Sequence, residues 1–221
     1  MSITLLVITD GRGDCLGRTL ASARTHLHGP ITRRVMIDDS ADTAYGVHLD
    51  QVHGHSFEII HHDRRRGFGG AIASGWSTLA VEPWVFHLED DFTFNRHVDL
   101  NAMARVLAAH PNLVQLALRR QPVNDAEAAA GGVVEMWPDE YTEATDGAGH
   151  HWLEHRLFFT TNPSLYRRSL TTAGWPTGEG SEQAFTDRVL ANDQLRCAFW
   201  GRRTDRPWVH HHGDHRVGTG Y

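Results

Sequence analysis

Residues 83–92 read PWVFHLEDDF, an apolar run that ends in three neighbouring carboxylates, Glu89, Asp90 and Asp91. A short apolar run of this kind is typical of a buried β-strand. The three carboxylates repel one another and reduce stability unless a cation or solvent compensates their charge. Hard divalent cations such as Mg²⁺ and Mn²⁺ take oxygen ligands, commonly carboxylates together with substrate phosphates. The segment therefore indicates a metal site at the end of a strand, with a solvated acidic loop as the alternative.

The sequence around this segment alternates between strand and helix signals from residue 3 to about residue 120. Further strands are predicted at 3–9, 33–39, 56–62 and 112–118, and helices at 16–27, 69–80 and 99–109. Strands and helices that alternate along a chain form a mostly parallel sheet with helices on both faces. The predicted fold class is therefore α/β.

Polar side chains stand at the carboxyl ends of four of these predicted strands. They are Thr9 and Asp10, Asp38 and Asp39, His61 to Asp63, and the acidic cluster at 89–91. Ligands bind outside the carboxyl ends of the strands in open α/β sheets. A single polar strand end is common in any loop, but four together indicate a cleft that concentrates carboxylates.

The composition limits the classes to which the chain can belong. Its 221 residues contain no repeat and no Pro/Ser-rich linker, which favours a single domain. A net charge of −6 argues against a protein that coats nucleic acid non-specifically. No apolar run is long enough to span a membrane, and the first residues show no signal-peptide pattern. We therefore expect no integral membrane segment. Because the two cysteines lie outside any CxxC pair, we also expect a cytoplasmic protein with free thiols.

The second half of the chain lacks this regular alternation. Residues 121–156 show no periodicity and predict a long irregular stretch, which is typical of functional lids or disordered insertions. A strand that runs into a helix is predicted at 157–170, and a helix with Ser181 as its N-cap at 178–191. The chain ends in PWVHHHGDHRVGTGY, residues 207–221.

The order of these segments resembles the nucleotide-sugar-dependent glycosyltransferases of the GT-A fold and is family-2-like. The strand end LEDDF, the strand end IDDS at 37–40 and the segment GFGGAIASGW at 67–76 carry the resemblance. It implies a single Rossmann-like domain over residues 1–221, with a nucleotide-sugar-binding half at 1–120 and an acceptor-binding and catalytic half at 121–221. The implied activity is a hexosyltransferase-type reaction that transfers a sugar from a nucleoside-diphosphate donor, expected to be a UDP-sugar, to an acceptor hydroxyl with inversion.

The resemblance also implies which residues bind the donor. Asp38 or Asp39 would recognise the uracil, and Asp91 would ligate the Mn²⁺ or Mg²⁺ ion that bridges the diphosphate. At Glu89 the sequence departs from the aspartate usual in the family, although some members read EDD. The further nucleotide-contacting residues implied are Thr9, Arg12, Arg66, Gly67, Glu89 and Asp90. For Arg64 to Arg66, a solvated basic loop is the alternative.

Two anchors near the C-terminus complete the resemblance. Glu182 would be the general base for the acceptor hydroxyl, with Glu179 second; the alternative is that acids in the first turn only stabilise the helix. His211 would be a late metal ligand, although His210 and His212 remain open, and Arg216 would reach the diphosphate.

Three tryptophans in the second half are candidate platforms for a sugar face: Trp137, Trp152 and Trp175. Tryptophan is also common in protein cores, which is the alternative for each of them. The acceptor classes that fit the sequence are a glycan, a lipid-linked sugar, a protein and modified DNA.

Two other functions compete with glycosyl transfer. Residues 210–215 spell HxHxDH, which is the dinuclear-zinc signature of metallo-β-lactamase-fold hydrolases. That fold needs the motif early in the chain, whereas here only six residues follow His215. The second alternative is a sugar- or nucleotide-binding module without catalysis.

Overall fold

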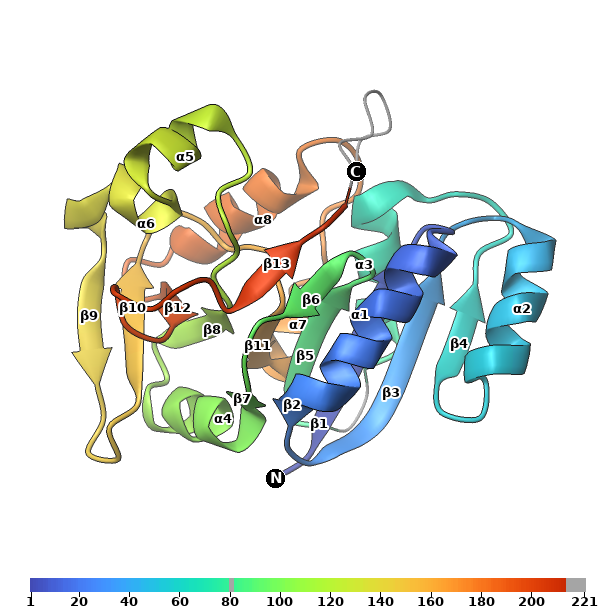
Figure 1. Ribbon diagram of the computed structural model, residues 1–221, viewed down its shortest axis with the longest axis horizontal. Coiled ribbons are helices and arrows are strands. Elements are labelled where there is room, and N and C mark those ends of the chain that lie inside the picture. Colours follow the sequence, from blue (N-terminus) through green and yellow to red (C-terminus); the bar gives the residue numbers. More distant parts are fainter. Residues whose placement is uncertain (80–81, 214–221) are drawn as a thin grey trace.

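The centre of the molecule is a sheet of nine strands within the residues that the structure describes, 1–79 and 82–213 (Figure 1). The structure is a computed structural model, and the order of its strands is β4-β3-β1-β5-β11-β8-β12-β10-β9. The strands are β1 (Ile3–Thr9), β3 (Ile31–Asp38), β4 (Glu58–His61), β5 (Trp84–Glu89), β8 (Leu113–Ala117), β9 (Thr142–Thr145), β10 (His151–His155), β11 (Ser164–Arg167) and β12 (Arg196–Trp200).

Parallel pairing brings three strand ends to one edge of this sheet. β1 pairs in parallel with β3 and β5, so that Thr9 lies opposite Asp38 and Ile8 opposite Glu89. β4 continues the parallel arrangement beside β3, whereas β11 is antiparallel to β5 and β8. The prediction of an α/β fold with a mostly parallel sheet is confirmed.

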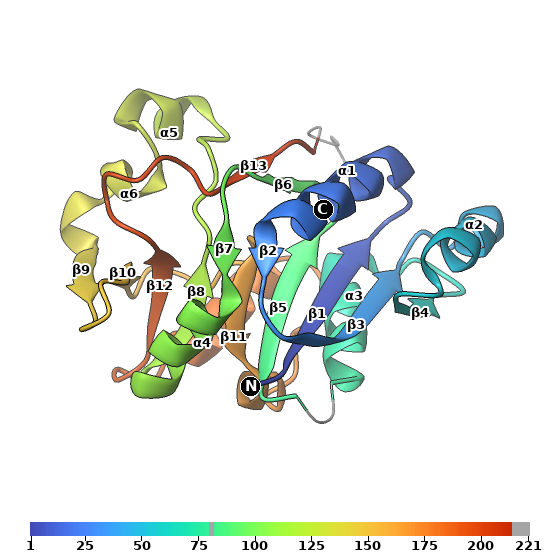
Figure 2. The same ribbon diagram turned by 60° about the horizontal axis from the view of Figure 1, so that its bottom comes forward.

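Helices cover both faces of the sheet (Figure 2). They are α1 (Gly13–His26), α2 (Thr43–His53), α3 (Gly67–Ser77), α4 (Leu100–Ala109), α5 (Asp125–Ala130), α6 (Val133–Met136), η1 (Pro138–Glu140), α7 (Arg168–Thr171) and α8 (Ser181–Leu190). Two short ribbons lie outside the main sheet: β2 (Leu27–His28) pairs with β7 (Val98–Asp99), and β6 (Phe92–Phe94) pairs with β13 (Val209–His211). Among the described helices, none is long and apolar enough to cross a membrane.

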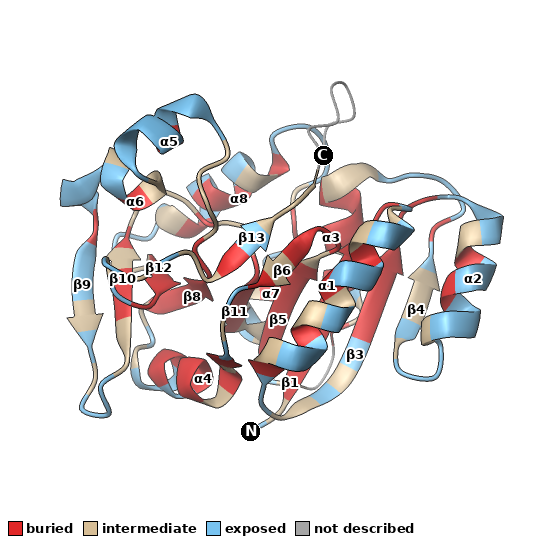
Figure 3. Ribbon diagram, in the orientation of Figure 1, coloured by how far each residue is buried: buried red, intermediate tan, exposed pale blue. Residues whose placement is uncertain are grey.

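The alternation of side chains along β1 explains the two layers of helices. Leu5 and Val7 belong to one buried cluster together with residues of α1 and α4. Leu6 and Ile8 point to the opposite face and belong to a second cluster with residues of α3 and α8. Both faces of the central strands are therefore buried, while α2 and α5 lie at the exposed periphery (Figure 3).

The structure differs from the sequence prediction at α2, at residues 121–156 and at Ser181, and it also contains β12 and the two short ribbons, which were not predicted. The helix α2 was not predicted; its N-cap Asp42 accepts hydrogen bonds from the backbone N–H groups of Ala44 and Tyr45. The predicted irregular stretch 121–156 instead contains α5, α6, η1, β9 and β10. Ser181 is the first residue of α8 and is buried, so its predicted capping role is wrong; the N-cap is Gly180, with a φ of 70°.

Two of the three candidate sugar platforms are core residues. Trp152 is 1% exposed and Trp175 is 5% exposed, so neither ring offers a face to a ligand. Trp175 packs against the rings of Trp76 and Phe185, at centroid distances of 5.1 and 4.6 Å. Trp137, at 44% exposure, is the candidate that remains accessible.

We expect Trp175→Ala to lower the free energy of unfolding by about 3–5 kcal/mol, because it removes a large buried ring and leaves a cavity. Trp137→Ala, the matched control on an exposed ring, should change it by about 0.5 kcal/mol or less. Urea denaturation of the two variants measures both values. A Trp175→Ala variant as stable as the wild type would contradict the assignment of this ring to the core.

Candidate active site

The acidic end of β5 lies among the carboxyl ends of its neighbours. The Thr9 hydroxyl donates a 2.7 Å hydrogen bond to Asp90 Oδ2, and Thr19 of α1 donates to the Asp90 carbonyl oxygen at 2.7 Å. Tyr45 of α2 approaches the Thr9 hydroxyl at 3.2 Å. Burial of this edge raises the pKa of Tyr45 to about 12. The structure thus brings the predicted residues Thr9 and Asp90 into direct contact.

Arg12 is the cation at the centre of this acidic cluster. Its guanidinium makes ion pairs with Asp10 at 2.9 Å, with Asp91 at 2.6 Å and with Asp90. Burial raises the pKa of Asp90 to about 6, against the opposing charge of Arg12. At Asp91, burial is outweighed by the hydrogen bond with His211 and the charge of Arg12, and the pKa falls below its usual value.

His211 reaches the same carboxylate from the other end of the sequence. In the β6–β13 ribbon it lies opposite Phe92, and its Nε2 atom is 3.1 Å from Asp91 Oδ2. The side chain of Gln121 holds the His211 backbone, accepting from its N–H at 2.9 Å and donating to its carbonyl at 2.6 Å. His210 is exposed, and the backbone N–H of His212 donates a hydrogen bond to the Asp91 carbonyl oxygen. Of the three candidate histidines, His211 is therefore the one whose ring contacts Asp91.

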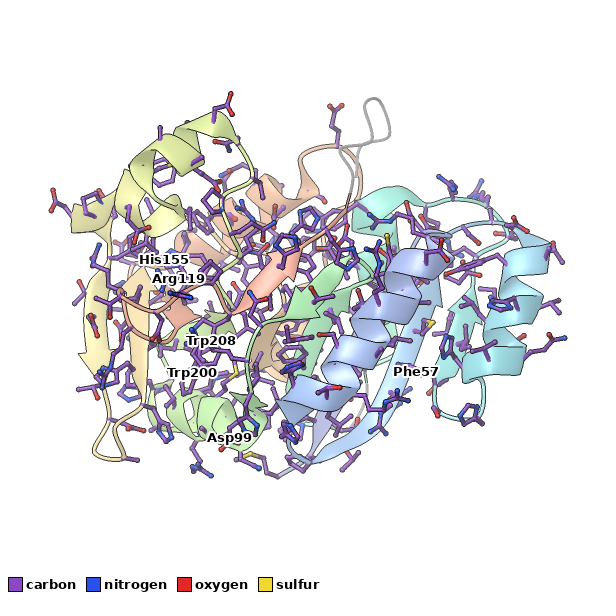
Figure 4. The ribbon with its side chains drawn as sticks, viewed as in Figure 1. Phe57, Asp99, Arg119, His155, Trp200 and Trp208 are labelled. Carbon is purple, nitrogen blue, oxygen red and sulfur yellow. The ribbon has the colours of Figure 1, made fainter. Side chains whose placement is uncertain are left out.

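A buried arginine fixes the segment that leads to His211. Arg119, labelled in Figure 4 near Trp208, donates to the carbonyl oxygens of Arg202 and Arg203 at 2.8 and 3.1 Å. The Arg119 carbonyl in turn accepts hydrogen bonds from the N–H groups of Trp208 and Val209. These contacts set the path of the chain immediately before β13, and so the position of His211.

The side chains around Asp91 fit a divalent cation that is completed by a substrate. Asp91 Oδ1 is buried and accepts no hydrogen bond from the described residues. A Cβ atom on Gly213 would lie 2.2 Å from Asp91 Oδ2, so only glycine leaves room there. In residues 1–79 and 82–213 no three His, Cys, Asp or Glu side chains form a full metal cage. One carboxylate with one imidazole is the kind of partial donor set that substrate phosphates complete.

Glu89 and Glu182 lie near each other, with Thr161 beside both. Both the N–H and the hydroxyl of Thr161 donate to Glu182 Oε1, at 2.7 and 3.1 Å, and Glu89 lies close enough to both residues for their groups to affect its pKa. Burial raises the pKa of Glu182. Burial and the charges of Asp91 and Glu182 raise the pKa of Glu89 well above its usual value. Glu182 therefore belongs to the same site as the acidic end of β5, whereas Glu179 is exposed in the preceding loop.

The two aspartates at the end of β3 are engaged differently. Asp39 accepts from the backbone N–H groups of Arg66 and Gly67 at 2.8 and 2.9 Å, and contacts His62 at 2.7 Å. Asp38 accepts from the Ser40 N–H at 3.0 Å and pairs with His61 at 2.8 Å. Asp39 thus fixes the loop that begins α3.

The arginines of that loop line an open pocket. Arg64, Arg65 and Arg66 border a cavity of about 550 Å³ together with Ser74 and Thr177. Arg65 also reaches the Asp10 carbonyl oxygen at 3.3 Å, which places this basic pocket next to the acidic cluster. Arg216, as well as Asp214 and His215 of the HxHxDH motif, lies outside the described residues.

The family of the chain follows from a match over most of its length. The family model described as glycosyl transferase family 2 matches residues 4–174. The chain belongs to this family. No curated protein matches the sequence significantly.

Solved structures similar to this family 2 chain share its fold at low sequence identity. S. aureus TarS (residues 1–349) has a TM-score of 0.63 at 14% identity, with 96% of this chain and 60% of that chain covered. GalNAc-T7, solved with UDP, GalNAc and Mn²⁺, has a TM-score of 0.66 at 11% identity and coverages of 96% and 43%. The mannosyltransferase PcManGT from Pyrobaculum calidifontis, solved with GDP-Man and Mn²⁺, has a TM-score of 0.62 at 14% identity and coverages of 92% and 57%. This family 2 chain therefore spans about 60% or less of each of these proteins.

Three residues of the candidate site were not predicted from the sequence. Tyr45, Gln121 and Thr161 support Thr9, His211 and Glu182 respectively, through single hydroxyl or amide groups. Such residues belong to no motif and stand far along the chain from the groups that they contact. Only for Tyr45 was a local clue available, because Asp42 is a favourable N-cap for the helix that carries it.

We expect Glu89→Gln to raise the midpoint of thermal unfolding at pH 8. Because the pKa of Glu89 is raised, the protonated side chain contributes its full stabilisation below the pKa that it has in the unfolded chain. This contribution is lost as the pH rises through the pKa that Glu89 has in the folded protein. The neutral amide removes this loss, so the difference between variant and wild type should disappear toward about pH 4. The exposed Glu140→Gln is the control and should show no such pH dependence. A lower midpoint for Glu89→Gln at pH 8 would show that the ionised carboxylate is stabilised.

Proposed function

We propose that this chain is a metal-dependent, inverting glycosyltransferase that moves a sugar from a nucleoside-diphosphate donor to an acceptor hydroxyl. The expected donor is a UDP-sugar. The observation that carries the proposal is the position of Asp91 between Arg12 and His211, with Glu182 near Glu89 at the same edge of the sheet. The similar structures solved with UDP-GlcNAc, with UDP and Mn²⁺, and with GDP-Man and Mn²⁺ support a nucleotide-sugar donor and a divalent ion.

Asp91 and His211 would hold the divalent ion, Mn²⁺ or Mg²⁺. When bound, this ion supplies positive charge opposite the diphosphate that leaves. Arg12, Arg66 and the backbone of Gly67 would position the phosphates, and Thr9, Glu89 and Asp90 would shape the cleft. Asp38 or Asp39 would recognise the nucleobase. Arg216 stays a proposed contact to the diphosphate.

Glu182 would take the proton of the acceptor hydroxyl. Its Oε1 atom accepts two hydrogen bonds from Thr161, which fixes the carboxylate, while Oε2 has no partner among residues 1–79 and 82–213. Burial raises the pKa of Glu182 toward the working pH, where a general base is most effective. The free Oε2 atom is therefore the proposed proton acceptor.

The acceptor would enter beside the exposed ring of Trp137. Of the candidate platforms, this ring has a free surface, and it stands between α6 and η1 in the second half of the chain. The acceptor classes proposed from the sequence stay a glycan, a lipid-linked sugar, a protein and modified DNA. A cytoplasmic location also stays a prediction.

The decisive experiment is a screen of UDP- and GDP-sugars for Mn²⁺-dependent release of the nucleoside diphosphate. One donor in the panel should be turned over, and chelation of the metal should stop the release. Mn²⁺-dependent binding of a nucleotide sugar without turnover would instead indicate a binding module. Hydrolysis with bound zinc would indicate the HxHxDH alternative.

We expect Asp91→Asn to reduce this release at least about 100-fold, because the loss of a ligand charge removes several kcal/mol of charge stabilisation. The far-UV circular dichroism spectrum should stay that of the wild type, since the amide keeps the shape of the side chain. Asp63→Asn, which alters an exposed acid just after β4, is the matched control and should keep full rate. A wild-type rate for Asp91→Asn with Mn²⁺ would make the acidic cluster a solvated loop.

We expect Glu182→Gln to lower kcat by about 10²–10⁴-fold while the Kd for the donor changes only a few-fold, since a general base acts on the acceptor proton. The acidic limb of the pH–rate profile should also disappear, because the variant lacks the carboxylate whose titration causes this limb. Glu179→Gln tests the exposed neighbour and should retain kcat. If Glu179→Gln loses the rate and Glu182→Gln keeps it, the base lies three residues earlier.

A further inference from the structure

Arg12 holds together carboxylates that are almost completely buried. The side chains of Asp10, Asp90 and Asp91 are 1–5% exposed, and that of Arg12 is 16% exposed. The Arg12 backbone is fixed as well, because it forms the N-cap of α1 and its carbonyl accepts from the Leu16 N–H at 2.9 Å. The cluster therefore carries its own counter-ion, delivered from a rigid helix start.

The contacts of Asp91 show which atoms this counter-ion engages. Asp91 Oδ2 lies 2.6 Å from an Arg12 nitrogen and 3.1 Å from His211 Nε2. A cation held by Asp91 and His211 would bind the Oδ1 atom, which has no partner in the described part of the chain, or this Oδ2 atom, together with His211 Nε2. Arg12 therefore pairs with the same carboxylate that the cation needs, and its positive charge opposes the cation unless Arg12 releases Asp91 or shares it.

We propose that Arg12 is a built-in counter-ion that competes with the divalent cation for Asp91, so that the cation binds weakly until a diphosphate is present. This inference rests on the proposed function. The phosphates of a nucleoside diphosphate offer Arg12 an alternative anionic partner and offer the cation further oxygen ligands. Arg12 thereby couples cation binding to donor binding.

Competition predicts a sign that other roles of Arg12 do not. An arginine that only binds phosphate would leave Mn²⁺ binding in the absence of donor unchanged when it is replaced. An arginine that only maintains the shape of the site would weaken Mn²⁺ binding when replaced. Removal of a competing positive charge a few ångströms from the site should instead tighten Mn²⁺ binding.

The test is a titration with Mn²⁺, followed by the electron paramagnetic resonance signal of the free ion, without donor and then with UDP. Without donor, we expect the Kd of Arg12→Met for Mn²⁺ to be at least about tenfold lower than that of the wild type. Addition of UDP should lower this Kd by a smaller factor than it does in the wild type. Its midpoint of thermal unfolding should be lower than that of the wild type without Mn²⁺ and should rise more when Mn²⁺ is added. Arg24→Met, on the exposed surface of α1, is the control and should match the wild type.

Equal or weaker Mn²⁺ binding by Arg12→Met overturns the inference. If this variant does not fold, Arg12→Gln replaces it, because glutamine removes the charge but keeps a hydrogen-bond donor for the carboxylates. Its Kd should then lie below that of the wild type, and an unchanged Kd again overturns the inference. Asp91→Asn separates the two hypotheses: if it binds Mn²⁺ like the wild type, the metal assignment in the proposed function fails. If it loses Mn²⁺ while Arg12→Met gains nothing, only the role of Arg12 fails.

Discussion

The packing of several carboxylates into one buried strand end is the constraint on which the rest of the site depends. Asp90 and Asp91 follow directly from a strand that is buried on both faces, so they cannot turn away into solvent. Each carboxylate needs a cation or a hydrogen-bond donor beside it, and the surrounding chain supplies both. Arg12 comes from the start of α1, Thr9 from the end of β1, and His211 from β13, more than a hundred residues away in sequence. The β6–β13 ribbon and the start of α1 thus position two of these partners, His211 and Arg12.

The same arrangement leaves part of the charge uncompensated. Glu89 and Glu182 lie near each other beside Thr161, and the pKa values of both are raised. A fold selected for stability alone would place neutral side chains at these two positions. The retained carboxylates therefore indicate that this edge is shaped by chemistry, since perturbed pKa values concentrate at functional sites.

The sequence predicted the sheet and the acidic edge because both depend on local pattern. Apolar runs that end in polar residues are enough to place strands and their carboxyl ends, as with Thr9, Asp38 and Asp91. Burial of a large aromatic ring depends on tertiary packing, which explains why Trp152 and Trp175 could not be separated from Trp137 by sequence. The helix α2 was missed because only Gly46 and Leu49 of its residues are buried, which leaves a weak apolar face. The choice among the three adjacent histidines needed the register of β13 against β6, which no local pattern contains.

The pairing of β13 with β6 keeps His211 apart from the main sheet. Residues 1–200 contain all nine strands of that sheet together with Arg12, Asp90 and Asp91. His211 reaches the acidic cluster through the β6–β13 ribbon and through Gln121, which holds its backbone. A chain released before residue 211 would keep the nine strands of the main sheet and lack one of the two side chains proposed to hold the ion.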